Sequence, residues 1–159
     1  MRRIKTLVLL SMALPVAAFA QEAAPAAPGE AGPHDFKAND AIGFTPFELP
    51  GFDTGVQLAV IHGDPMAASG DYTIRLLFPD GYRFPAHHHP KAEHLTVLTG
   101  MFLIGMGTDE NPDALEEYSP GSFLYFPPNE DHYGGVTGQT VIQLHGQAPF
   151  EVVLANAGT

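Results

Sequence analysis

The 159-residue sequence has no cysteine and few charged residues, which make up 16% of the chain against a usual level of about 25%. The lack of cysteine excludes disulfides, thiolate catalysis and metal sites with sulfur ligands. Basic residues are scarce, with seven Lys and Arg against 18 Asp and Glu and a formal net charge of −11. Because phosphates and anionic headgroups repel such a surface, nucleic acid and membrane surfaces are disfavoured as partners.

Glycine and proline are abundant, with 17 and 15 residues respectively. Both destabilise helices, glycine through its backbone entropy and proline through its missing N–H and its ring. Apolar residues nevertheless reach 45% of the chain, which argues against disorder over most of its length. The composition therefore favours a turn-rich all-β domain over a helical bundle.

The first 20 residues are typical of a secretory signal peptide. Three basic residues near the start precede an apolar run, Leu7 to Phe19, that ends in the small-x-small pattern Ala18-Phe19-Ala20. The run is short for a membrane span and contains Pro15, so export with cleavage is favoured over anchoring. We expect a periplasmic or secreted protein that begins at Gln21 and has no stable membrane association. It would keep four basic and 18 acidic residues, a formal charge of −14.

The rest of the chain divides into a leader and one domain. Residues 21–40 are rich in Ala, Pro and Gly and predict a flexible leader, whereas residues 41–159 alternate short apolar runs with turn signals. This spacing predicts an antiparallel sandwich or barrel, with one short helix at Asn111–Tyr118 that Asn111 would cap. The predicted strands are Val56–Ile61, Tyr72–Phe78, His94–Thr99, Phe102–Met106, Phe123–Phe126, Val141–His145 and Phe150–Leu154.

A cluster of histidines and one glutamate is the chemically informative feature. In an extended chain His87 and His89 share a face, Glu93 lies four residues further on, and His132 follows a second strand and turn. Imidazole and carboxylate ligands suit a divalent ion without any sulfur. Three neutral imidazoles and one carboxylate would leave a net charge of +1 at such an ion, with positions open to water or substrate.

At these residues the sequence resembles the cupin superfamily. The first cupin motif, G-x5-H-x-H-x3-4-E-x6-G, is matched by Gly81, His87, His89, Glu93 and Gly100. The second, G-x5-P-x-G-x2-H-x3-N, is matched at Gly121, Pro127 and His132. Asn129 stands where the family has glycine and Val136 where it has asparagine. Asparagine tolerates the left-handed backbone of a tight turn, so we expect the first change to be mild.

The resemblance implies a single-domain jelly-roll β-barrel with its motif core at residues 81–136. It also implies that His87, His89, Glu93 and His132 are ligands of one divalent metal ion, which could be Fe, Mn, Ni or Zn. The nearby His88 and His94 fall on the opposite alternation and are expected outside or at the rim. Five aromatic and aliphatic residues are expected to form the core and the cavity wall, namely Phe84, Leu95, Phe102, Phe123 and Phe126.

Four further polar residues are candidates for the cavity. His145 could face inward and orient a metal-bound imidazole, or it could simply pack in its strand. Arg75 could bind a substrate carboxylate, although an ion pair at a sheet edge explains it as well. Tyr133 and Gln143 could donate hydrogen bonds in the cavity, or serve turn and strand packing.

The fold does not fix the function, because similar cupin sites serve enzymes, storage proteins and sensors. The sequence is similar to small exported bacterial cupins, which in turn resemble the cupin half of zinc-binding anti-sigma factors. We expect no counterpart here of the helical half that would hold a sigma factor. Two functions stay open: a metal-dependent oxygenase- or isomerase-type enzyme acting on a small molecule, and a non-catalytic module that binds or senses a ligand. An open barrel could also form a homodimer through an edge strand.

Overall fold

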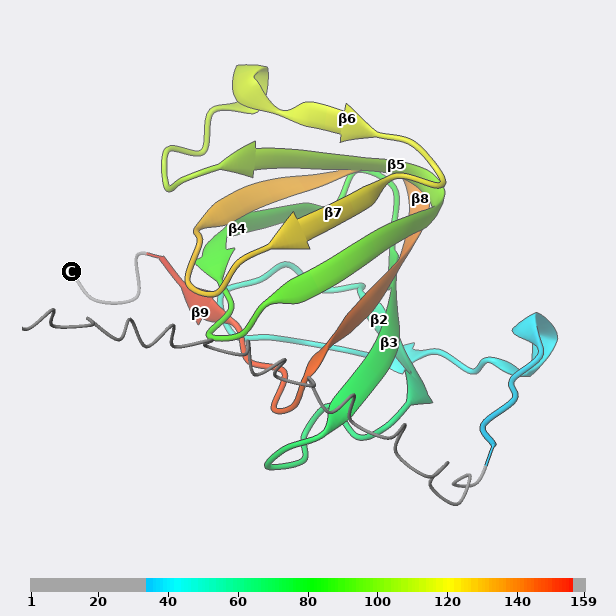
Figure 1. Cartoon of the computed structure of the whole chain (residues 1–159). Coiled ribbons are helices and arrows are strands. Elements are labelled where there is room, and N and C mark those ends of the chain that lie inside the picture. Colours follow the sequence, from blue (N-terminus) through cyan, green and yellow to red (C-terminus); the bar gives the residue numbers. More distant parts are fainter. Residues whose placement is uncertain (1–33, 156–159) are drawn as a thin grey trace, which may run out of the picture. The chain divides into compact units, whose positions relative to one another are not determined.

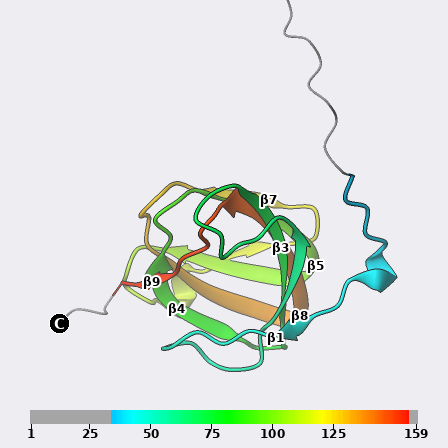
Figure 2. The same ribbon diagram turned by 90° about the horizontal axis from the view of Figure 1, so that it is seen from below.

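Antiparallel pairing joins all the strands of this chain into one curled sheet in the computed structural model, which describes residues 34–155 (Figure 1). Viewed from below, the labelled strands lie around a common interior (Figure 2). The all-β jelly-roll class predicted from the sequence is therefore confirmed. The predicted signal peptide, and the predicted leader as far as residue 33, lie outside the described residues.

The strands range in length from two residues in the first and the last to 14 and 16 residues in the two longest. In chain order the elements are a 3₁₀ turn at Asn39–Ala41, β1 (Thr45–Pro46), β2 (Gln57–His62), β3 (Asp71–Phe78), β4 (Arg83–His88), β5 (Glu93–Met106), a 3₁₀ turn at Pro112–Ala114, β6 (Glu116–Tyr118), β7 (Phe123–Phe126), β8 (His132–Gln147) and β9 (Val153–Leu154).

The two longest strands, β5 and β8, organise the barrel. They pair along their whole lengths, from Glu93 opposite Gly146 to Met106 opposite His132. On its other side β8 pairs with β3 through its C-terminal half and with β4 through its N-terminal half. The free side of β5 pairs with β6 and β7. Side chains of β5 and β8 therefore contribute to the interior over the full length of the barrel.

A bulge in β4 determines which of its side chains point inward. Phe84 lies opposite Gly134 and His87 lies opposite His132, so three residues of β4 span two of β8. The extra residue places Phe84 and His87 on the same inner face although they are three positions apart. Pro85 suits the irregular segment because it has no N–H to contribute to the ladder.

The bounds of the strands differ from the prediction where glycine occurs. Gly100 was expected to separate two strands, but β5 runs through it with two irregularities in its register. Gly100 has a φ of 75°, and a Cβ there would lie 2.1 Å from Thr140 Oγ1, so glycine bends the strand without ending it. The strand predicted at Val141–His145 is also longer in the structure, where it forms part of the C-terminal half of β8.

The predicted helix at 111–118 is wrong beyond its first turn. Asn111 does cap it, since its side chain accepts a hydrogen bond from the Asp113 N–H at 3.0 Å. The helix ends after Ala114, and Glu116–Tyr118 becomes β6 because these residues pair with the edge of β5, with Tyr118 opposite Phe102. Pairing with β5 thus overrides the helical propensity of the sequence. Among the described residues, no helix is long and apolar enough to cross a membrane.

Candidate metal centre

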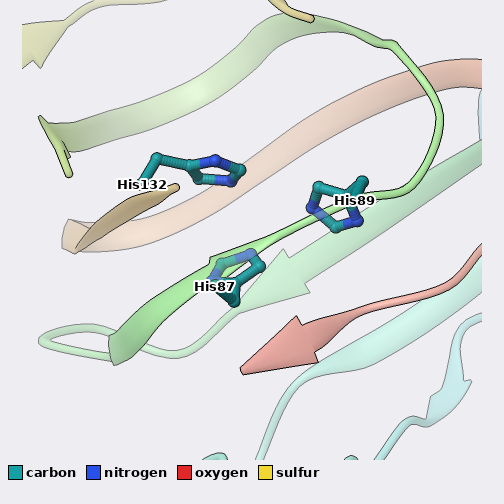
Figure 3. Close-up of side chains that lie close together, drawn as sticks. All are labelled: His87, His89 and His132. Carbon is teal, nitrogen blue, oxygen red and sulfur yellow. The ribbon is translucent and has the colours of Figure 1, made fainter. Parts of the chain in front are cut away.

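Three buried histidines meet inside the barrel (Figure 3). His87 is near the end of β4, His89 follows in the next turn, and His132 begins β8. Each can offer one ring nitrogen such that all three nitrogens lie within 4.8 Å of one another. Antiparallel pairing accounts for the closest approach, because His87 and His132 are direct cross-strand partners with ring centroids 4.4 Å apart.

The backbone fixes the same tautomer for all three histidines. Each Nδ1–H donates to a carbonyl oxygen: that of Pro85 for His87 at 2.7 Å, of Glu151 for His89 at 2.8 Å and of Glu130 for His132 at 3.0 Å. Because a carbonyl oxygen can only accept, Nδ1 must carry the proton and a neutral ring keeps its lone pair on Nε2. Such hydrogen bonds are the usual means of orienting metal-binding imidazoles.

The surroundings also keep these rings neutral. Burial lowers the pKa of His87 to about 3 and that of His89 to about 4, and it lowers the pKa of His132 as well. The positive charge that His132 would carry lowers the pKa of His87 further. At neutral pH the three Nε2 lone pairs are therefore available together.

Glu93 lies beside this cluster at the start of β5. The residue is 4% exposed, and its Oε2 lies 3.1 Å from His89 Nε2. Its other oxygen, Oε1, is buried without a hydrogen-bond partner among the described residues. Burial raises the pKa of this carboxyl to about 8. A buried carboxylate with an unpartnered oxygen is costly, and such a group in a native protein requires a partner.

The residues present fit a metal ion. They supply three neutral nitrogen donors oriented by the backbone and one carboxylate whose Oε1 has no other partner. A divalent cation would satisfy that oxygen and would separate the lone pairs of His89 Nε2 and the ionised Glu93. The histidine cluster could thus hold a metal ion, and Glu93 lies beside it.

Aromatic rings hold the histidines in place. Phe126 stacks on His132 with ring centroids 4.4 Å apart, and Phe150 stacks on His89 at 5.6 Å. Phe52 meets the edge of His87 at 5.3 Å. The rings therefore restrict the histidines on the sides that the hydrogen bonds leave free.

The cluster opens into a cavity of about 80 Å³ inside the barrel. A cavity needs roughly 10–15 Å³ of such volume to hold one water molecule. This cavity therefore has room for several waters or for a small organic molecule. Its walls are apolar apart from the histidines and Glu93, and comprise Phe47, Leu49, Phe52, Val56, Leu76, Phe78, Tyr82, Phe84, Leu95, Phe102, Ile104, Phe126, Ile142, Leu144, Phe150 and Val152.

Three of the polar candidates lie on the outer face of the sheet instead. Arg75, Gln143 and His145 alternate along β3 and β8 with residues that line the cavity, and none of the three lines it. Arg75 donates to Gln143 Oε1 at 3.0 Å and to Asn39 Oδ1 at 3.1 Å, and no described carboxylate pairs with it. His145 Nδ1 lies 3.0 Å from Thr73 Oγ1. These residues form a polar network on the outside of the barrel.

Two aromatic candidates also lie away from the cavity. Tyr133 follows His132 and faces the opposite way, where it packs closely against Gly105 and donates to the Asn111 carbonyl at 3.0 Å. Phe123, which was expected in the core or cavity wall, is 61% exposed because it alternates with buried Leu124. The exterior positions expected for His88 and His94 match the structure: His88 Nδ1 lies 2.8 Å from Asp131 Oδ1, and His94 is exposed.

Sequence reasoning missed the residues at the mouth of the cavity. Among the lining residues, five are partly exposed and mark where the cavity reaches solvent: Phe47, Leu49, Phe52, Phe150 and Val152. They come from two segments far apart in the chain that have no regular strand period. The available signal was the concentration of apolar residues at 44–52 and 150–154, outside the two motifs.

Comparison with curated sequences gives one relevant relative. Over 121 residues the chain is 31% identical to germin-like protein 4-1 from Oryza sativa subsp. japonica. The match covers 69% of this chain but 42% of the rice protein, so the chain spans less than half the length of that relative. No family model matches the sequence.

Solved structures are similar in fold at low sequence identity. The polyketide cyclase RemF from Streptomyces resistomycificus matches with a TM-score of 0.62 and 20% identity, over 77% of this chain and 85% of that one. A cupin 2 conserved barrel domain protein from Rhodopseudomonas palustris matches with 0.58 and 14%, over 76% and 84%. The DMSP lyase DddQ from Ruegeria pomeroyi matches with 0.57 and 17%, over 76% and 64%. At these identities the comparisons establish the architecture.

Proposed function

Since this chain has the fold of the cupin superfamily, we propose that it binds one divalent metal ion through His87, His89, His132 and Glu93 and acts on a small molecule in the adjoining cavity. The observation that carries the proposal is the buried Oε1 of Glu93, which has no partner among the described residues beside three oriented imidazoles. A nitrogen-rich site with one carboxylate and no sulfur suits Fe, Mn, Ni or Zn.

A metal ion in this position would act as a Lewis acid toward an oxygen of the bound molecule. The protein would contribute the orientation of the ligands and the environment of the bound molecule. The backbone carbonyls hold the imidazoles in one tautomer, and the apolar wall excludes bulk water from the bound molecule. Two proteins with a similar fold carry the names of enzymes, a polyketide cyclase and a DMSP lyase. These names support, by analogy, an enzymatic role on a small molecule.

A non-catalytic binding or sensing module is the second candidate, and the cavity wall favours it. Apart from the proposed ligands, the residues that line the cavity in the described chain include one titratable group, Tyr82. Its hydroxyl already donates to the Asp53 carbonyl at 2.7 Å. A reaction that needs a separate general acid or base would have to use Glu93 or water for that role.

We also propose that the protein acts outside the cytoplasm. The support is the pattern of residues 1–20, which combines a basic start, an apolar run and a small-x-small site. Fractionation of the native cells, with N-terminal sequencing of the mature protein, tests this. A chain that begins at Gln21 in the periplasm or medium agrees with export, and a cytoplasmic chain that retains Met1 contradicts it.

Turnover experiments separate the enzyme from the module. Protein loaded with each of Fe(II), Mn(II), Ni(II) and Zn(II) is incubated with a panel of small acids, phenols and ketones, and products and oxygen consumption are followed. Conversion that requires metal and disappears in His87→Ala, but persists in the outer-face control His94→Ala, supports the enzyme. A compound that binds with a metal-dependent affinity and is recovered unchanged supports the module.

A further inference from the structure

We infer that the cavity selects small molecules with a single oxygen-bearing end and an otherwise hydrocarbon body, an inference that rests on the proposed metal site. Polar groups of the cavity are gathered at one place, the three histidines and Glu93. A ligand oxygen that needs a donor or a cation can be satisfied there, whereas the side chains of the remaining described wall present no free donor.

The remaining wall offers almost no hydrogen bonds. Its residues are aliphatic or aromatic hydrocarbons except Tyr82, whose hydroxyl proton is committed to Asp53. A hydroxyl or amide placed against the hydrocarbon part of this wall loses its water without gaining a partner, which weakens binding roughly 10- to 100-fold for each group. Sugars and other molecules with polar groups on every side are therefore disfavoured.

The lysines and arginines of the described chain all interact with groups outside the cavity. None of them lines the cavity, and each donates to other groups: Lys37 to the Val60 and Ile61 carbonyls, Arg75 to Gln143 and Asn39, Arg83 to the Tyr82 and Val136 carbonyls, and Lys91 to the Ala148 carbonyl. A carboxylate at the far end of a ligand would therefore be buried without a counter-charge. Dicarboxylates and zwitterions are disfavoured for this reason.

The residues at the entrance of the cavity also favour ligands with an apolar body. The partly exposed lining residues lie in two segments, 47–52 and 150–152, and are all apolar. Phe47 and Phe150 contact each other with ring centroids 6.3 Å apart. A ligand must thus shed the water around its body as it passes between hydrocarbon side chains, which favours an apolar body.

Matched pairs of ligands test this selection directly. The full-length mature protein is loaded with Co(II), and metal content is measured first. Calorimetry and the visible Co(II) spectrum then follow binding of 4-methylbenzoate against terephthalate, and of butanoate against succinate. The members of each pair share one carboxylate end and differ by a methyl or a carboxylate at the other. We expect the dicarboxylate to bind roughly 100-fold more weakly in each pair.

A variant of the entrance provides the second measurement. Phe47→Arg places a cation on the partly exposed edge of the cavity, and we expect it to reduce the discrimination against terephthalate by roughly tenfold. Thr54→Arg is the matched control, because Thr54 is exposed and does not line the cavity. The control should keep the selectivity of the unmodified protein.

The possible failures are distinct. A protein that takes up no Co(II) overturns the proposed function and this inference with it. A protein that takes up Co(II) but binds terephthalate as tightly as 4-methylbenzoate, or binds neither monocarboxylate, overturns the inference alone. Equal selectivity in Phe47→Arg and Thr54→Arg would overturn the role assigned to the entrance.

Discussion

His89 Nε2 and Glu93 Oε2 lie 3.1 Å apart, although the neutral imidazole and the ionised carboxylate each present only a lone pair to the other. The His89 Nδ1–H is already donated to the Glu151 carbonyl, so the ring cannot turn a proton toward Glu93 without becoming charged. A cation must therefore lie between the two groups. In the metal-free chain it is a proton on Glu93, because burial raises the pKa of this carboxyl to about 8 and lowers that of His89 to about 4.

The first prediction concerns the pH dependence of stability in the metal-free protein. Glu93 releases its proton near pH 4.5 in the unfolded chain and near pH 8 in the folded one. Between these values Glu93 binds more protons in the folded state than in the unfolded state, so its contribution to the free energy of unfolding falls as the pH rises. Above about pH 7.5 the three buried histidines are nearly neutral in both states, because their pKa is 6.5 in the unfolded chain and lower in the fold, so they add little slope. From pH 7.5 to 9 we expect the loss of about 0.5–1 kcal/mol.

Urea unfolding in the presence of a chelator measures this slope. Glu93→Gln keeps the shape of the side chain and cannot ionise, and its amide N–H can donate to His89 Nε2. The variant should lose little stability over the same range of pH. Equal slopes for the two proteins would mean that Glu93 does not carry the pH dependence.

The second prediction separates the ring that stacks on His132 from the rest of the core. Phe126→Leu should lower the free energy of unfolding by about 1–2 kcal/mol and weaken metal binding about tenfold, because His132 loses its packing partner. Phe102→Leu is the control, since Phe102 is equally buried and stacks on Phe84 instead. Urea unfolding and metal titration should give similar losses of stability but a loss of metal affinity in Phe126→Leu only. Equal metal affinities in the two variants would contradict this role of Phe126.

The third prediction concerns Asn129, which stands where the second cupin motif has glycine. Its φ is 62°, the left-handed region, and its N–H donates to the His89 carbonyl at 2.8 Å. Asn129→Ala should destabilise the protein by about 1 kcal/mol because an alanine is strained in this conformation, whereas Asn129→Gly should change stability by less than about 0.5 kcal/mol. Thermal and urea unfolding measure both. An alanine variant as stable as the glycine variant would contradict the strain argument.

The fourth prediction follows from the outer-face network. Arg75→Ala and His145→Ala remove hydrogen bonds outside the barrel, so each should cost about 1 kcal/mol of stability and leave the metal content unchanged. Elemental analysis of the purified variants provides the measurement. A loss of metal in His145→Ala would place that residue in the metal site, contrary to its position in the structure.

The sequence predicted the parts of the molecule that depend on local spacing. Alternation along an extended chain was sufficient to place His87 and His89 on one face with His88 on the other, and the tolerance of asparagine for a left-handed turn anticipated Asn129. In β8 the same alternation also predicts the outward orientation of two polar residues that were considered as cavity candidates. Apolar Ile142 and Leu144 alternate with Gln143 and His145, which indicates that the polar pair faces outward.

Features that depend on contacts distant in sequence could not be predicted in this way. The bulge that turns Phe84 and His87 to one face is defined by the pairing of β4 with β8. The helical propensity at 111–118 gave way to pairing with β5 because an open strand edge was available to Glu116–Tyr118. The entrance of the cavity joins segments about 100 residues apart that have no regular period.

The metal content of the protein tests the central claim most directly. Mature protein purified from its native compartment, and His87→Ala, His132→Ala and His94→Ala prepared in the same way, are analysed for transition metals after dialysis. We expect about one equivalent in the unmodified protein and in His94→Ala, and little metal in the two cavity variants. Metal-free unmodified protein that also fails to bind added divalent ions, or full metal content in both His87→Ala and His132→Ala, would contradict that claim.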